Sequence, residues 1–72
     1  MDPNRRAQIN SDIRDLESVN GRMQRDIANR ESMIRGLASN APQRQGWEAE
    51  VRNLKSHVTA NEGRIRELRR LL

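Results

Sequence analysis

Apolar residues recur along the chain at alternating intervals of three and four, and this pattern is interrupted once, around residues 39–42. Such spacing places the apolar residues on one stripe of an α-helix, the stripe that packs in a coiled coil. The interruption divides the stripe into two arms. The first arm comprises Ile9, Ile13, Leu16, Asn20, Met23, Ile27, Arg30, Ile34 and Leu37, and the second comprises Trp47, Val51, Leu54, Val58, Asn61, Ile65, Leu68 and Leu72. The sequence therefore predicts an all-α fold, an antiparallel two-helix coiled-coil hairpin.

The ends of the two helices have their own sequence signals. Asp2 can accept hydrogen bonds from the first turn of a helix, and Pro3 suits the first helical position. Pro42 cannot continue a helix, and Asn40 is a residue that tolerates the left-handed conformation of a C-terminal cap. We expect one domain, residues 1–72, with a helix over about 3–38, a turn over about 39–41, and a second helix over about 42–72 that opens on Pro42.

The position of the turn sets how the arms face each other. If the reversal lies between Asn40 and Ala41, facing residue numbers sum to 81, and Asn20 lies opposite Asn61. The other heptad-compatible sums, 74 and 88, would place Asn20 opposite a leucine. A buried amide needs a polar partner, so we expect Asn20 and Asn61 to form a polar core layer that sets the register. The alternative is one long helix coiled in parallel with its copies, in which Pro42 would cost about 3 kcal/mol.

A charged residue, Arg30, also occupies the predicted seam. We expect its stem to pack on Val51 and its guanidinium to extend outward to Asp26, one turn earlier. The alternative interpretation is a docking charge for an acidic group on a partner. Acid-before-base pairs with helical i, i+4 spacing are Asp26/Arg30, Glu31/Arg35, Glu48/Arg52 and Glu62/Arg66.

The two flanks of the seam differ in polarity. In heptad notation Ile13 is an a position and Leu16 a d position, and the flanking positions are e and g. The e positions are charged or polar throughout. Apart from Met1, the large aliphatic residues outside the seam are all at g positions, and with the histidine they form a set: Val19, Met33, His57 and Leu71. This set predicts self-association into a four-helix bundle, with a dimer favoured, or docking of a partner protein helix.

Basic charge suggests a second function. Thirteen arginines and one lysine give the chain a formal net charge of +4. In a hairpin, six arginines come to the open end, where they can contact phosphates: Arg5, Arg6, Arg64, Arg66, Arg69 and Arg70. Weak nucleic-acid or other polyanion binding is therefore the alternative function. Against it, acidic residues lie nearby and no aromatic residue is placed to stack on a base.

The remaining chemistry argues against catalysis. The chain has one histidine, no cysteine and no glycine-rich phosphate loop, so we expect no enzyme activity, cofactor, metal or small-molecule substrate. His57 can face Asp26 across the g flank, which we interpret as a surface pair. No apolar run approaches the about 20 residues of a membrane span, and the N-terminus lacks a signal-peptide stretch. We expect a soluble intracellular protein, cytoplasmic by default, without membrane association.

These features together favour a non-enzymatic oligomerisation or protein-interaction module. The only ordered surface in the pattern is a seam and its apolar flank, both of which bury against helices. We expect a module of this kind to serve as the N-terminal assembly domain of a larger structural, scaffolding or nucleocapsid-type protein.

Overall fold

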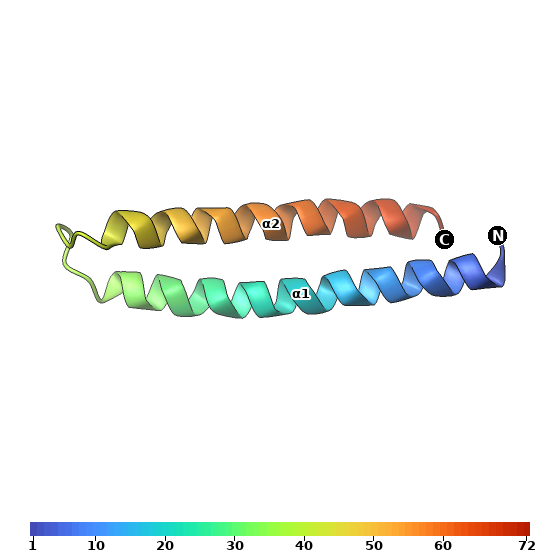
Figure 1. The fold of residues 1–72 in the computed structure, drawn as a ribbon, viewed down its shortest axis with the longest axis horizontal. Coiled ribbons are helices and arrows are strands. Elements are labelled where there is room, and N and C mark those ends of the chain that lie inside the picture. The colour runs from blue at the N-terminus through green and yellow to red at the C-terminus, as the bar shows by residue number, and fades with distance from the viewer.

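The structure is a computed structural model that describes all residues, 1–72. It contains two helices and no strand: α1 spans Pro3–Arg35 and α2 spans Arg44–Arg70. The helices run antiparallel along their full shared length, and the N-terminus of α1 extends beyond the C-terminus of α2 (Figure 1). The hairpin measures 56 × 15 × 12 Å. The predicted all-α hairpin is therefore confirmed.

The beginning of α1 has the predicted cap. Asp2 has an extended backbone, and its Oδ1 accepts a hydrogen bond of 2.9 Å from the backbone N–H of Asn4. Pro3 occupies the first helical position. A backbone N–H at this position has no acceptor within the helix, so the N–H that proline lacks costs no hydrogen bond. The sequence therefore fixes the first turn of α1 through two adjacent residues.

The predicted bounds of the turn were wrong. We expected residues 39–41 to form it, whereas the connection covers residues 36–43, because α1 ends at Arg35 and α2 begins at Arg44 rather than at Pro42. The expected left-handed cap at Asn40 is also absent, since no residue of the chain has a positive φ. Instead Gly36 caps α1 in a right-handed conformation, with φ −80° and ψ −8°. Glycine is a weak helix former, which favours this early end.

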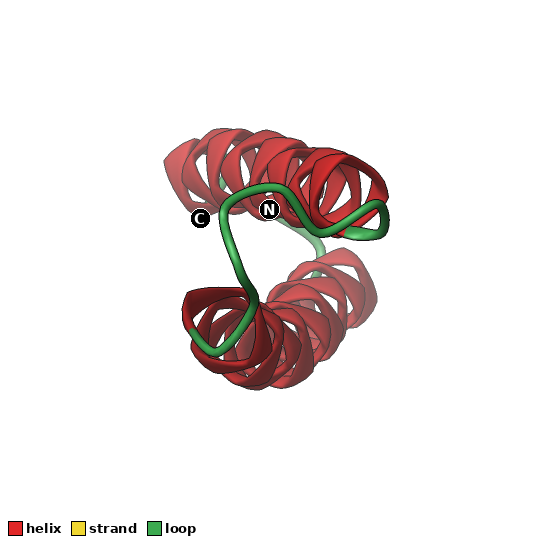
Figure 2. Cartoon of the chain, turned by 90° about the vertical axis from the view of Figure 1, so that its left-hand side faces the viewer, coloured by secondary structure: helices red, strands yellow, loops and turns green.

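The longer connection is held by polar contacts that local sequence signals do not reveal. The guanidinium of Arg44 donates hydrogen bonds to the carbonyls of Ile34, at 3.1 Å, and Leu37, at 3.4 Å. Backbone bonds of the i to i+3 kind link Ala41 to Ala38 and Arg44 to Ala41. Figure 2 shows the connection crossing from one helix to the other at the end of the hairpin. An arginine at the start of α2 thus donates to one carbonyl in the last turn of α1 and to one in the connection.

The second helix also ends slightly earlier than predicted. α2 stops at Arg70, and Leu71 and Leu72 form a final turn in which Leu71 caps the helix. Both leucines are exposed. The sum of 81 also places Leu72 opposite Ile9, but the exposed Leu72 adds little burial there. Ile9 is instead buried in a cluster with Ile13, Ile65 and Leu68.

The core is divided into two clusters by the asparagine layer. The cluster at the open end contains Ile9, Ile13, Ile65 and Leu68, and the cluster nearer the turn contains Ile27, Ile34, Val51 and Val58. Between them, Asn61 Nδ2 donates to Asn20 Oδ1 at 2.9 Å, and Asn20 Nδ2 donates to the Val58 carbonyl at 3.3 Å. Asn20 is the only buried polar residue, and both of its side-chain polar atoms are satisfied. The two asparagines face each other, as the sum of 81 requires.

Candidate self-association face

The a and d positions of the seam are buried to different extents. Every a position except Leu72 is buried: Ile13, Asn20, Ile27, Ile34, Val51, Val58 and Ile65. Among the d positions, only Ile9 and Leu68 at the open end are buried, whereas Leu16, Met23, Arg30, Leu37, Trp47, Leu54 and Asn61 are only partly buried. On a helix, a positions adjoin e and d positions adjoin g. The incompletely covered part of the seam therefore lies on the g flank.

The predicted g-flank residues add apolar surface to these d positions. Val19 is partly buried and His57 is exposed, while Met33 retains 54% and Leu71 45% of their accessible surface. We call the surface formed by these four residues and by the partly buried Leu16, Met23, Trp47 and Leu54 the apolar face. The structure therefore leaves one long side of the hairpin with apolar side chains that the two helices do not cover.

A group of three charged side chains interrupts the apolar face. Arg30 donates from Nε to Asp26 Oδ1 at 2.9 Å, as predicted, and its Nη1 pairs with Glu50 of the other helix. Asp26 and Glu50 are both g positions, so this contact confirms that the g positions of the two helices share one side. The pKa of Arg30 is raised from its ordinary value, first by the hydrogen bond to Asp26. The group carries two carboxylates and one guanidinium, a net charge of −1.

Two predicted contacts near this group were wrong or incomplete. Asp26 pairs with Arg30 and makes no ion pair with His57, because Arg30 reaches it within the same helix. Glu50 was not predicted as a partner of Arg30. Its g position was the available signal, since g positions of antiparallel arms lie on the same side of the seam.

The opposite side of the hairpin, formed by the e positions, is bridged by ion pairs. Arg69 binds Glu17 at 3.1 Å and Lys55 binds Glu31 at 3.4 Å, each between the two helices. These pairs replace part of the predicted set: Glu31 binds Lys55 instead of Arg35, and Glu48 binds Arg44 instead of Arg52. All of these groups are substantially exposed, so each pair adds little stability.

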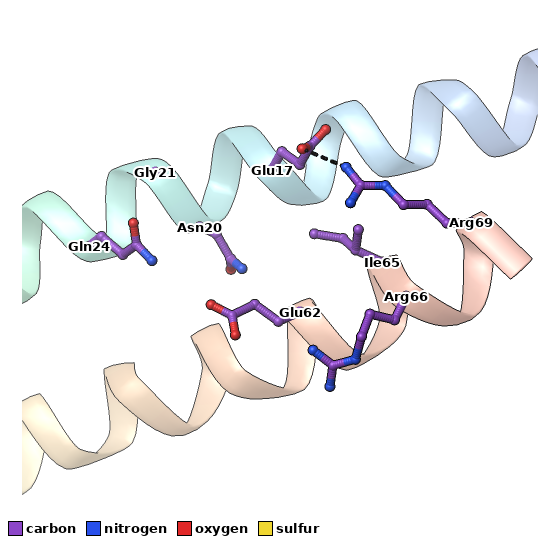
Figure 3. Close-up of a pocket in the computed structure, with 8 residues that line it drawn as sticks. All are labelled: Glu17, Asn20, Gly21, Gln24, Glu62, Ile65, Arg66 and Arg69. Carbon is purple, nitrogen blue, oxygen red and sulfur yellow. Dashed lines mark hydrogen bonds and ion pairs between the residues drawn. The ribbon is translucent and has the colours of Figure 1, made fainter.

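A shallow hollow of about 390 Å³ lies on this charged side beside the asparagine layer. Figure 3 shows Glu17 and Arg69 joined across it, with Asn20 and Ile65 directed into the space between the helices. Arg66 points away from α1. The hollow is open and lined mainly by polar and charged side chains, so it lacks the apolar lining typical of a small-molecule pocket.

The six predicted anion-binding arginines do not form one surface. Arg64 borders a hollow on the g flank, whereas Arg69 lies on the e flank in its ion pair with Glu17. Arg64 pairs with Glu67 at 3.3 Å, and Arg6 donates to the backbone carbonyl of Leu72 at 3.2 Å. The other three, Arg5, Arg66 and Arg70, are exposed. Acidic neighbours thus partly neutralise the open end, and its positive charge is spread around the helices.

The rest of the molecule holds no metal-binding cluster and no membrane-spanning helix. No group of three or more His, Cys, Asp or Glu side chains is arranged to hold a metal ion. Neither helix contains a stretch both long and apolar enough to cross a lipid bilayer. No protein-family model, curated protein or solved structure matches the chain. The incompletely covered apolar face is consequently the most distinctive surface of the hairpin.

Proposed function

We propose that the chain is a non-enzymatic self-association module in which the apolar faces of two hairpins pack together as a four-helix bundle. The observation that carries the proposal is the uneven burial of the seam. The a positions are buried, whereas most d positions remain partly exposed on the same side as Val19, Met33 and Leu71. Packing against a second hairpin would cover both sets of residues at once.

The small core of one hairpin supports this proposal. Only nine of the 72 residues are buried, and no side chain retains less than 2% of its accessible surface. Single cores of this size rarely provide enough stability, and oligomerisation is a common remedy. Removal of apolar surface from water contributes roughly 25 cal/mol per Å², so covering the partly exposed d positions stabilises the assembly and the fold together.

A dimer with two-fold symmetry is the favoured assembly. A bundle of two hairpins gives each apolar face one partner and leaves the charged e side in solvent. A module of this kind multimerises the protein that contains it, as in a structural, scaffolding or nucleocapsid-type protein. Docking of a helix from a different protein on the same face is the other outcome that the experiment below distinguishes.

Sedimentation equilibrium of the parent chain and of two double variants tests the proposal. Val19→Glu with Met33→Glu places two charges on the apolar face, outside the core of the single hairpin, and should convert a dimer to a monomer that remains helical by circular dichroism. Ser18→Glu with Ser32→Glu is the matched control, because both serines are exposed f positions on the outer side of α1. The control should retain the dimer mass.

Two results would contradict self-association through this face. A parent chain that sediments as a monomer up to near-millimolar concentration has no such dimer, and this result would favour docking of a helix from a different protein instead. A dimer whose mass is unchanged by Val19→Glu with Met33→Glu associates through another surface.

A further inference from the structure

The charged residues of the apolar face are distributed unevenly along its length. Toward the turn lies the group of Asp26, Arg30 and Glu50, with its net charge of −1. Toward the open end lies Arg64, which borders a hollow with Asp12, Asp15, Leu16 and Leu68. Arg64 has one weak contact, a pair with Glu67 at 3.3 Å in which both side chains are more than half exposed. Its guanidinium is therefore available to a carboxylate from outside the hairpin.

Two hairpins can face each other with their turns at the same end or at opposite ends. With turns at the same end, residues at a given distance from the turn meet the residues at the same distance from the turn in the partner. The group around Arg30 then meets its own copy, which brings four carboxylates and only two guanidiniums into one desolvated layer. Like charges brought together in an interface are unfavourable, and their desolvation adds to the cost.

With turns at opposite ends, the group around Arg30 no longer meets its own copy and faces the part of the partner that carries Arg64. A two-fold axis that passes near His57 places Arg64 of one hairpin opposite Glu50 of the other, because both residues are seven positions from His57 on α2. The same axis places Leu68 near Trp47 of the partner, because the two residues lie at nearly equal distances from His57 along α2. A symmetric dimer forms this contact twice, once for each copy. Each Arg64 then gains a carboxylate partner, and its guanidinium balances the net charge of −1 on the partner's group around Arg30.

We infer that a second copy of this chain docks on the apolar face with its turn at the opposite end, guided by pairing of Arg64 with the partner's Glu50. This inference rests on the proposed self-association. It adds the orientation of the two copies and the residue pair that selects it. Steering by such pairs specifies orientation more than it adds affinity.

Distance measurement between spin labels tests the orientation directly. The chain has no cysteine, so Ser39→Cys provides a single labelling site at the turn. Opposed turns should separate the two labels by roughly 40 Å, since each turn lies about 14 residues from the axis at 1.5 Å per residue. Adjacent turns should give about 20 Å or less, two interaxial spacings. The short distance would overturn the inference while leaving self-association intact, and no intermolecular distance in a monomer would remove both.

Charge reversal tests the residue pair. Arg64→Glu should weaken the dimer about tenfold or more, since it opposes an acidic partner surface, and adding Glu50→Arg should restore most of the affinity. Arg66→Glu makes the same charge change away from the apolar face and should leave the dissociation constant nearly unchanged. Circular dichroism of each variant verifies that the hairpin is helical. A double variant that binds no better than Arg64→Glu would show that these two residues do not meet.

Discussion

Glycine occurs inside both helices, at Gly21 and Gly63, at positions where no contact requires it. A Cβ at Gly21 would lie 3.7 Å from the guanidinium of Arg25, and one at Gly63 would lie 3.8 Å from that of Arg66. Both are ordinary van der Waals distances to flexible side chains, and neither glycine has a positive φ. Because glycine is a weaker helix former than alanine, the hairpin is destabilised where the asparagine layer already interrupts its apolar core.

Replacement of these residues should therefore stabilise the protein. Gly21→Ala and Gly63→Ala should each raise the free energy of unfolding by about 1 kcal/mol, measured by urea denaturation. The two effects should add, since the residues are on different helices and share no contact. Lower stability in either variant would indicate that another molecule approaches the backbone at that glycine.

At the scale of the helices, the asparagine layer couples α1 to α2 through hydrogen bonds that depend on both residues. Removal of Asn61 leaves the buried Oδ1 of Asn20 without its donor. Removal of Asn20 leaves the amide of Asn61 without its acceptor, whereas the Val58 carbonyl loses only a second donor and keeps its place in the hydrogen bonding of α2. A buried polar group without a partner costs about 1–3 kcal/mol, whereas two leucines would extend the apolar core across this layer.

The leucine variants should show this coupling. Asn20→Leu with Asn61→Leu should be more stable to thermal unfolding than the parent, and each single variant should be less stable than the double variant. Asn61→Leu should be the worse single change, because Asn20 is buried while Asn61 is partly accessible to water. Additive effects in this double-mutant cycle would argue that the two amides act independently. The double variant should also lose fidelity of register, visible as heterogeneous mass in sedimentation.

The seam was predictable from sequence because its buried positions are mostly apolar and recur with helical spacing. Asn20 and Asn61, the cap at Asp2 and the pairing of Arg30 with Asp26 all follow from spacing and residue type. The connection was less predictable, because Arg44 donates hydrogen bonds to carbonyls ten and seven residues earlier in the chain, outside its own helix. The partners of Glu31 and Glu48 were also missed, since exposed charged side chains choose among several partners of nearly equal free energy. The apolar face was identified by its residues, but its docking role remains a prediction.

At the scale of the whole molecule, the hairpin is one helix pair thick. At 56 × 15 × 12 Å, it has no interior beyond the seam, so any added burial must come from a second molecule. The apolar face and the charged e side lie on opposite long sides of this rod. If association adds burial, the free energy of unfolding should rise with protein concentration as the dimer becomes populated. Variants should therefore be compared at one concentration.

The asparagine layer has a consequence for the order in which the hairpin closes. It separates the apolar side chains into two groups, and the group containing Ile34 and Val51 is joined by a connection of only eight residues, 36–43. The group containing Ile9 and Leu68 closes a far longer loop, which costs more chain entropy unless the first group has already formed. The helices should therefore pair first at the turn end during folding. The open end should be the first part to unfold locally. Hydrogen exchange should be slower at Val51 than at Leu68, and the reverse order would show that the hairpin does not open from its free ends.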